Sequence, residues 1–128
     1  MDNDAYGHVN NVVYYAYFDT VVNAFLMHST GRDIRQLPQI GVVAETACRY
    51  FSSLSFPQPL EVGLAVERLG QRSVSYRLGV FAAGANVAAA LGRFVHVYVD
   101  SVTRTAIDVP ACIRAAVSPL VVDDPIWI

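Results

Sequence analysis

The sequence predicts an α+β domain in which one long helix is followed by a run of antiparallel strands. Two observations lead to this prediction. Apolar residues recur at helical spacing between residues 11 and 28, and from about residue 41 the apolar side chains alternate with polar ones. The chain has 128 residues, enough for one domain with a substantial core, and shows no linker, repeat or low-complexity tract. We therefore expect residues 1–128 to form a single domain.

The predicted helix covers residues 11 to 28. Asn10 or Asn11 is suited to cap its start, because a short polar side chain there accepts a hydrogen bond from the first turn. Residues 29–31, Ser-Thr-Gly, break the pattern at the other end. The apolar stripe is wide, as expected of a helix that lies against a sheet, and it consists of Tyr14, Tyr17, Phe18, Val21, Phe25 and His28.

Four strands are predicted after the helix, over residues 42–51, 60–67, 74–80 and 87–99. The connection from Leu69 to Arg72 has the length and the glycine of a hairpin turn. Alternation in the last strand gives it one face with Phe94, His96 and Tyr98. Pro110 then opens a short helix through about Val117, which Pro119 ends. The sheet is expected to wrap the long helix.

The composition indicates a protein that associates with itself. It is 54% hydrophobic and 16% charged, which is more apolar surface than a lone small domain easily hides, so we expect a homodimer or a homotetramer. The net charge is −2 and the arginines are scattered, which argues against nucleic acid as a partner. No apolar run approaches the roughly 18 residues of a membrane span, and no leader opens the chain, so we expect a cytoplasmic protein.

The cysteines and histidines give no sign of a metal site. Cys48 and Cys112 lie far apart and fit neither a disulfide framework nor a paired ligand spacing, which predicts two buried thiols in a reducing compartment. His28 and His96 are expected to be packing residues with satisfied hydrogen bonds, and the histidines show no ligand spacing. We therefore predict neither a metal nor a cofactor.

The first residues of the chain carry the functional signal. Residues 2–11, Asp-Asn-Asp-Ala-Tyr-Gly-His-Val-Asn-Asn, are called the N-terminal motif below. This motif and the aromatic helix behind it resemble the signature of the 4-hydroxybenzoyl-CoA thioesterase-like family, and residues 69–73 resemble the hairpin of that family. The resemblance extends from Asp2 to about Pro110. It implies the hotdog fold, a long helix wrapped by an antiparallel sheet.

The resemblance implies hydrolysis of an acyl-CoA thioester at a site between two subunits whose sheets join edge to edge. It makes Asp4 the nucleophile or the general base, and the backbone N–H of Asn11 the group that polarises the carbonyl. The chemistry agrees, because unpaired amides at a helix N-terminus bind an oxyanion and their dipole keeps a nearby carboxylate ionised. Gly7 lets the backbone bend and the substrate approach closely. His8 is expected to bond the carboxylate or the attacking water, or to assist the leaving thiolate.

Contacts with the rest of the substrate are expected further along the chain. The CoA phosphates favour arginine, and Arg72 beside Ser73 matches the phosphate-contacting region of the family. Weaker candidates for this role are Arg49, Arg68 and Arg93. Tyr14 is expected in the core or in the wall of the acyl pocket. Glu45 lies on a predicted strand, so the role of a helix glutamate in another branch of the superfamily is not assigned to it.

Two other activities have to be weighed against the thioesterase. A non-catalytic hotdog dimer that binds an acyl-CoA would share the whole pattern, and Asp4 would then have no chemical role. A hydratase or dehydratase would need a histidine paired with a carboxylate in a different pattern, which the sequence does not show. Relatives also have a strand before the motif, whereas Met1 stands where that strand would end. We therefore expect the first strand of the sheet to be missing or truncated.

Overall fold

The computed structural model describes residues 11–51 and 59–123, with the backbone alone for residues 11–13. The elements, in chain order, are helix α1 (Asn11–Thr30), the 3-10 turn η1 (Ile34–Gln36), strands β1 (Gln39–Tyr50), β2 (Leu60–Leu69), β3 (Ser73–Ala82) and β4 (Ala90–Asp100), helix α2 (Ala111–Val117) and the 3-10 turn η2 (Ser118–Leu120). This order confirms the predicted α+β class. The prediction about a strand before the helix falls on residues outside the described part of the chain.

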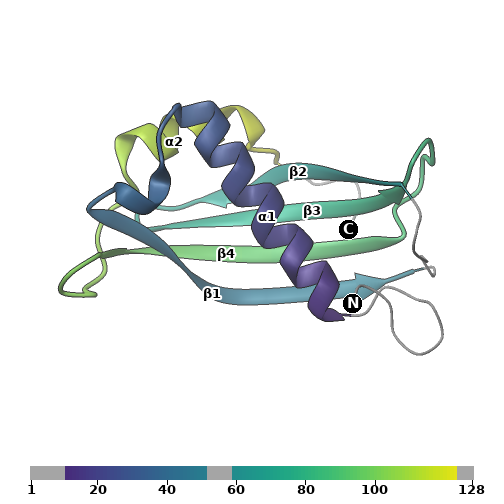
Figure 1. The fold of residues 1–128 in the computed structure, drawn as a ribbon, viewed down its shortest axis with the longest axis horizontal. Coiled ribbons are helices and arrows are strands. Elements are labelled where there is room, and N and C mark those ends of the chain that lie inside the picture. Colours follow the sequence, from purple (N-terminus) through teal and green to yellow (C-terminus); the bar gives the residue numbers. More distant parts are fainter. Residues whose placement is uncertain (1–10, 52–58, 124–128) are drawn as a thin grey trace.

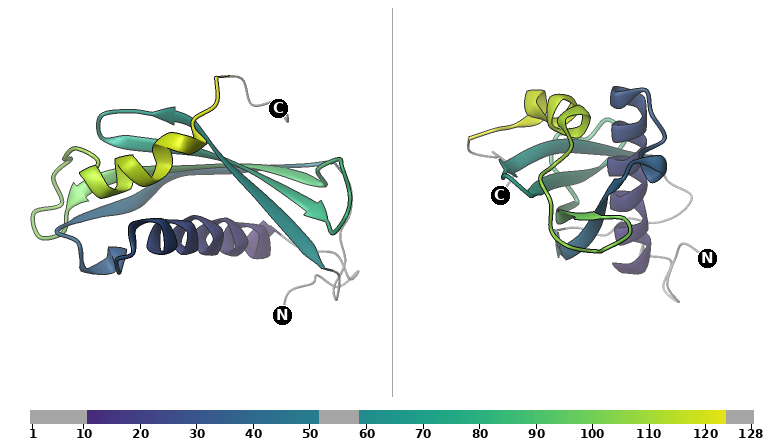
Figure 2. Two further views of the ribbon diagram at one scale, coloured as in Figure 1. Left: turned by 90° about the horizontal axis from the view of Figure 1, so that it is seen from above. Right: turned by 90° about the vertical axis from the view of Figure 1, so that its left-hand side faces the viewer.

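The four strands form one antiparallel sheet in the order β1-β4-β3-β2. Helix α1 lies along one face of this curved sheet, and α2 lies beside the C-terminal part of α1 (Figures 1 and 2). The sheet therefore wraps the long helix as expected of a hotdog fold. Within the described residues, no helix is long and apolar enough to cross a membrane.

Several predicted boundaries are corrected by the structure. Helix α1 is two residues longer than predicted, because the Thr30 hydroxyl bonds the carbonyl of Leu26 and Gly31 ends the helix with a φ of +66°. Strand β1 starts at Gln39, and β4 starts only at Ala90, after a turn in which Gly84 has a φ of +81°. The Leu69–Arg72 hairpin is confirmed. Helix α2 begins after Pro110 and ends at Val117, as predicted, and Pro119 lies in the 3-10 turn that follows it.

The face of α1 that packs on the sheet is shifted from the predicted stripe, which did not include Val22 and Leu26. Residues four apart lie on the same side of a helix, and the fully buried ones are Tyr14, Phe18, Val22 and Leu26. The predicted Val21 and Phe25 are half-buried, and His28 is exposed. The alternation in β4 is confirmed, since Phe94, His96 and Tyr98 are buried on the face that α1 covers.

Phe18 fixes the distance between α1 and the sheet. Its ring lies against the backbone of β4 at Gly92, where a Cβ atom would overlap the ring. Phe18 is completely buried and in contact with Tyr14, so the ring has no space to move into. The close approach of helix and sheet therefore depends on the missing side chain of Gly92.

Gly92→Ala is expected to destabilise the protein by about 1–3 kcal/mol, because it overpacks a filled core. Urea unfolding measures this difference in the free energy of unfolding. The Phe18→Leu substitution makes room at the same place, so the double variant should be more stable than the sum of the two single losses predicts. Strict additivity of the two substitutions would contradict this account of the contact.

Candidate active site

Helix α1 begins at Asn11, directly after the rest of the N-terminal motif in sequence. Asp4, Gly7 and His8 lie outside the described residues, so their predicted roles stay predictions. The start of the helix at Asn11 is confirmed. A helix N-terminus leaves its first backbone amides without partners inside the helix. Any negative charge that develops near this end is favoured by the helix dipole.

The N-terminal end of α1 lies over the C-terminal end of β1. The rings of Tyr14 and Tyr50 are 5.0 Å apart between centroids and tilted by 60°. Tyr14 is 1% exposed, and burial raises its pKa to about 12, so its hydroxyl stays protonated. This packing supports the core role of Tyr14. Cys48 lies close by, half-buried, and burial raises the pKa of its thiol.

The predicted phosphate contacts lie at the other end of the sheet. Tyr50 pairs with Ala90, whereas Ser73 pairs with Val97, which is seven residues further along β4. At about 3.3 Å per residue, this separation is about 23 Å. The Arg72 side chain is 57% exposed, with its Nε atom 3.5 Å from Asp108. Within one chain, Arg72 and Ser73 therefore do not join the N-terminus of α1 in one site.

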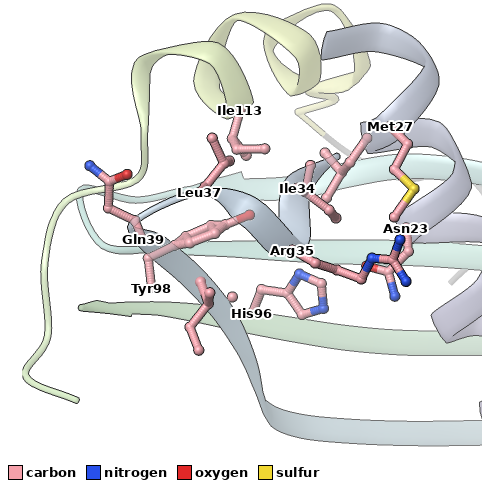
Figure 3. Close-up of a pocket in the computed structure, with 12 residues that line it drawn as sticks. Asn23, Met27, Ile34, Arg35, Leu37, Gln39, His96, Tyr98 and Ile113 are labelled. Atoms are coloured by element: carbon pink, nitrogen blue, oxygen red, sulfur yellow. The ribbon is translucent and has the colours of Figure 1, made fainter. Parts of the chain in front are cut away.

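A pocket of about 290 Å³ lies at this second end, between the C-terminal half of α1 and the start of β1 (Figure 3). Helices α1 and α2, the turn η1, and strands β1 and β4 all contribute to its wall. The lining residues are Asn23, Leu26, Met27, Ile34, Arg35, Leu37, Gln39, Ile40, Gly41, His96, Tyr98 and Ile113. Most of the wall is apolar, and four polar side chains interrupt it: Asn23, Arg35, Gln39 and His96.

His96 is the most unusual of these four polar residues. It is 3% exposed and its ring packs edge-on against Tyr76, Phe94 and Tyr98. Its Nδ1 atom is buried and has no hydrogen-bond partner among the described residues. Burial lowers its pKa to about 4, so the imidazole is neutral at pH 7. The prediction of a satisfied packing histidine was therefore wrong about the hydrogen bonds, which alternation along a strand does not reveal.

Two of the other three, Arg35 and Asn23, already have side-chain partners. The Arg35 guanidinium makes two bonds to the Asp33 carboxylate, of 2.9 and 3.0 Å, and these bonds hold the pKa of Asp33 below its usual range. Asn23 donates to Asp19 along the same helix, at 3.1 Å. Arg35 is largely exposed, so it lies at the mouth of the pocket. His96 is consequently the buried polar group of this wall whose hydrogen bonding is incomplete.

Arg93 and Arg49, two of the weaker candidates for contacting the CoA phosphates, lie on the face of the sheet opposite α1. Arg93 is 3.4 Å from Glu45 and 3.5 Å from Glu67, and Arg77 bonds Glu67 at 2.8 Å. Arg77 and Arg93 are directly paired across β3 and β4, so Glu67 offsets the repulsion of two like charges. Their guanidinium groups hold the pKa of Glu67 below its usual value. Together with Arg49 they line a hollow on this face, away from α1.

The described residues contain no cluster of three His, Cys, Asp or Glu side chains that could hold a metal ion. Cys48 and Cys112 are both free thiols, half-buried and not fully buried as predicted. The described residues offer two separate features: the N-terminus of α1 and, at the other end of the sheet, a largely apolar pocket with His96 in its wall.

Comparison with known proteins identifies the family. The family model described as the thioesterase superfamily matches residues 6–89, and no curated protein matches. The crystal structure of the PA5185 protein from Pseudomonas aeruginosa is 46% identical, with a TM-score of 0.91, over 97% of this chain and 87% of that chain.

Two further structures share the fold at lower identity. The BH1999 gentisyl-coenzyme A thioesterase is 21% identical, with a TM-score of 0.79, over 91% of this chain and 92% of its own. The SAV2348 protein from Staphylococcus aureus, solved in complex with CoA, is 18% identical, with a TM-score of 0.82, over 93% of this chain and 76% of its own. The chain belongs to the thioesterase superfamily and has the hotdog fold.

Proposed function

We propose that this protein hydrolyses an acyl-CoA thioester to the free acid and CoA, at a site built on the N-terminus of α1. The observation that carries the proposal is the start of α1 at Asn11, directly behind a motif that contains a carboxylate, a glycine and a histidine. Membership of the thioesterase superfamily supports the reaction class. The CoA complex of the Staphylococcus aureus protein supports CoA as the carrier of the acyl group.

The proposed reaction needs a nucleophile on the thioester carbon and a donor for the oxygen. Asp4 either attacks the carbon itself or removes a proton from a water that does so. The Asn11 N–H donates to the oxygen as it gains charge, and the helix dipole stabilises that charge. The carbon–sulfur bond then breaks and CoA leaves as a thiolate. His8 assists the water or the thiolate, and Gly7 lets the substrate approach the backbone.

We further propose that two subunits pair through the outer edges of their β1 strands. β1 is twelve residues long and none of its residues is buried. In the described part of the chain, only β4 pairs with it. Large exposed apolar side chains gather on and beside it: Val42, Val43, Tyr50 and Phe51. A long, uncovered apolar edge of this kind favours pairing with another strand.

The symmetry of such a dimer would complete the site. Two identical strands that pair antiparallel are related by a two-fold axis perpendicular to the sheet, so both helices lie on the same face. The end of β1 at Tyr50 then meets the start of β1 in the partner. The N-terminus of α1, which lies over Tyr50, would come to the end of the partner that carries Arg72, Ser73 and the pocket.

Val43→Lys is expected to weaken the dimer by about tenfold or more and to lower thioesterase activity in parallel. Val43 lies near the middle of β1, so in a pair centred on this strand the two-fold axis would bring the new charge close to its own copy, where like charges repel. Sedimentation at micromolar concentration measures the association. Val102→Lys is the matched control, because Val102 is 86% exposed on a turn outside the strands. A dimer that withstands Val43→Lys would contradict pairing through this edge.

The activity itself is tested by a screen that detects free thiol, with CoA thioesters of short, long and aromatic acids. Release of CoA that is lost in Asp4→Asn supports the enzyme. A protein that binds acyl-CoA but releases no thiol from any substrate would instead be the non-catalytic binding protein, and the proposed reaction would be wrong.

A further inference from the structure

We propose that Arg104, in the turn that follows β4, binds a phosphate group of the CoA carrier. This inference rests on the proposed function and adds a substrate-binding residue to that site. It is carried by the backbone conformation of Arg104, an exposed arginine with a φ of +63°. In the described part of the chain, the other residues with a positive φ are both glycines, Gly31 and Gly84.

The turn from Asp100 to Thr105 holds Arg104 in this conformation. The Asp100 carboxylate accepts from the N–H groups of Thr103 and Val102, at 2.9 Å each, and these bonds hold the pKa of Asp100 below its usual value. The Asp100 N–H donates to the carbonyl of Thr105, and the Arg104 N–H donates to the carbonyl of Asp100, both at 2.9 Å. The bonds across the turn therefore keep residue 104 in the left-handed region.

A left-handed backbone is costly for arginine, because its Cβ atom crowds the following carbonyl oxygen, whereas glycine adopts it freely. The Arg104 side chain does not repay this cost within the fold. It makes no ion pair or hydrogen bond with any residue that the structure describes, and the Asp100 carboxylate is already occupied by backbone N–H groups. Strained residues cluster at ligand-binding sites, where the side chain has a task that glycine does not perform.

The turn lies at the end of the sheet where the phosphates of CoA are expected (Figure 1). The Tyr98 N–H donates to the carbonyl of Arg72, and the Arg104 N–H bonds Asp100, two residues further along β4. Two strand residues cover about 7 Å, so the backbones of the two arginines approach neighbouring points of β4. CoA carries a diphosphate and a separate ribose 3′-phosphate, which offers a phosphate group to each arginine.

The same turn contacts the start of β1. The Ser101 N–H donates to the carbonyl of Pro38 at 2.8 Å. Beside it, Gln39 pairs with Asp100. In the proposed dimer, this end of β1 meets the N-terminus of α1 from the other subunit. A thioester held at that N-terminus would therefore have its CoA beside the turn that carries Arg104.

The exposure of Arg104 favours a phosphate over a carboxylate. An exposed arginine gains little free energy from one carboxylate, because water screens the pair. A phosphate group carries more negative charge and accepts two parallel bonds from the planar guanidinium. A phosphate of the substrate is thus the ligand whose binding offsets the strain in the turn.

The first test measures binding without turnover, by calorimetry for CoA and dephospho-CoA and by NMR titration for the weaker pantetheine. Arg104→Gly should weaken CoA binding by about fivefold and leave the binding of pantetheine, which has no phosphate, within about twofold. Dephospho-CoA lacks the 3′-phosphate and identifies the group that is bound. Equal losses for CoA and dephospho-CoA assign Arg104 to the diphosphate, whereas a loss for CoA alone assigns it to the 3′-phosphate.

Thermal unfolding tests the strain separately. Arg104→Gly should raise the Tm by about 2–5 °C, because glycine adopts the left-handed region freely, so weaker CoA binding would not reflect unfolding. Arg104→Lys keeps both the charge and the strain, so its Tm should stay unchanged and part of the CoA affinity should remain. Arg32→Gln is the control for net charge, because Arg32 is exposed on the loop after α1, and it should bind CoA within about twofold of the wild type.

Unchanged CoA affinity in Arg104→Gly, an equal loss for pantetheine, or no binding of CoA to the wild type would overturn the binding role of Arg104. A lower Tm in Arg104→Gly would show that the arginine serves the fold, which also contradicts the inference. A protein that binds CoA through Arg104 but hydrolyses no thioester would leave the inference standing and overturn the proposed function.

Discussion

Asp4→Asn is expected to lower kcat/KM for acyl-CoA hydrolysis on the order of a thousandfold, within the range of a positioned general base. The amide has the size of the carboxylate but neither takes a proton from water nor attacks the carbonyl carbon. The helix amides at Asn11 remain in the variant, so substrate binding should change little. The loss should therefore fall on kcat and leave KM within about threefold.

Asp2→Asn is the matched control, because it removes the same charge two residues earlier in the same segment. If general electrostatics of the N-terminal motif were responsible, both substitutions would lower the rate by similar factors. We expect Asp2→Asn to stay within about twofold of the wild type, as is usual for a terminal solvated residue. Equal losses in the two variants would remove Asp4 from the chemistry.

The fold was predictable because its signals are local. Alternation along residues 60–67 and 74–80, with Gly70 between them, determines a hairpin whichever way the rest of the chain folds. The ends of elements were less accurate. The start of β1 at Gln39 is fixed by pairing with Asp100, a residue far away in sequence, and periodicity carries no information about that contact.

The site was predictable only in part, for a physical reason. A contiguous motif reveals the residues around a helix N-terminus, and the start of α1 at Asn11 agrees with it. The pocket instead consists of single residues from α1, η1, β1, β4 and α2. His96 looks like any inward strand residue, and only the packing around it shows that its Nδ1 atom has no partner.

Acid is expected to destabilise the protein through His96, by about 3 kcal/mol between pH 7 and pH 4. Burial lowers the pKa of His96 from 6.5 to about 4 in the folded protein, and one pKa unit corresponds to about 1.4 kcal/mol. Between these two values the unfolded chain binds a proton that the folded chain does not, so stability falls as the pH falls. The groups around the imidazole are Asp19 on α1, Arg35 in η1, Tyr76 on β3 and its neighbour Tyr98. Of these, Asp19 opposes the shift, but less strongly than burial promotes it.

Urea unfolding of the wild type and of His96→Phe at pH 7, 5.5 and 4 isolates this contribution. Carboxylates with a lowered pKa, such as Glu67 and Asp100, also lose stabilising interactions in acid, but they do so in both proteins. The stability of His96→Phe relative to the wild type should therefore increase by about 3 kcal/mol as the pH falls from 7 to 4. Parallel pH profiles would mean that the imidazole is protonated in the folded protein. His96 would then be a buried cation in the wall of the pocket.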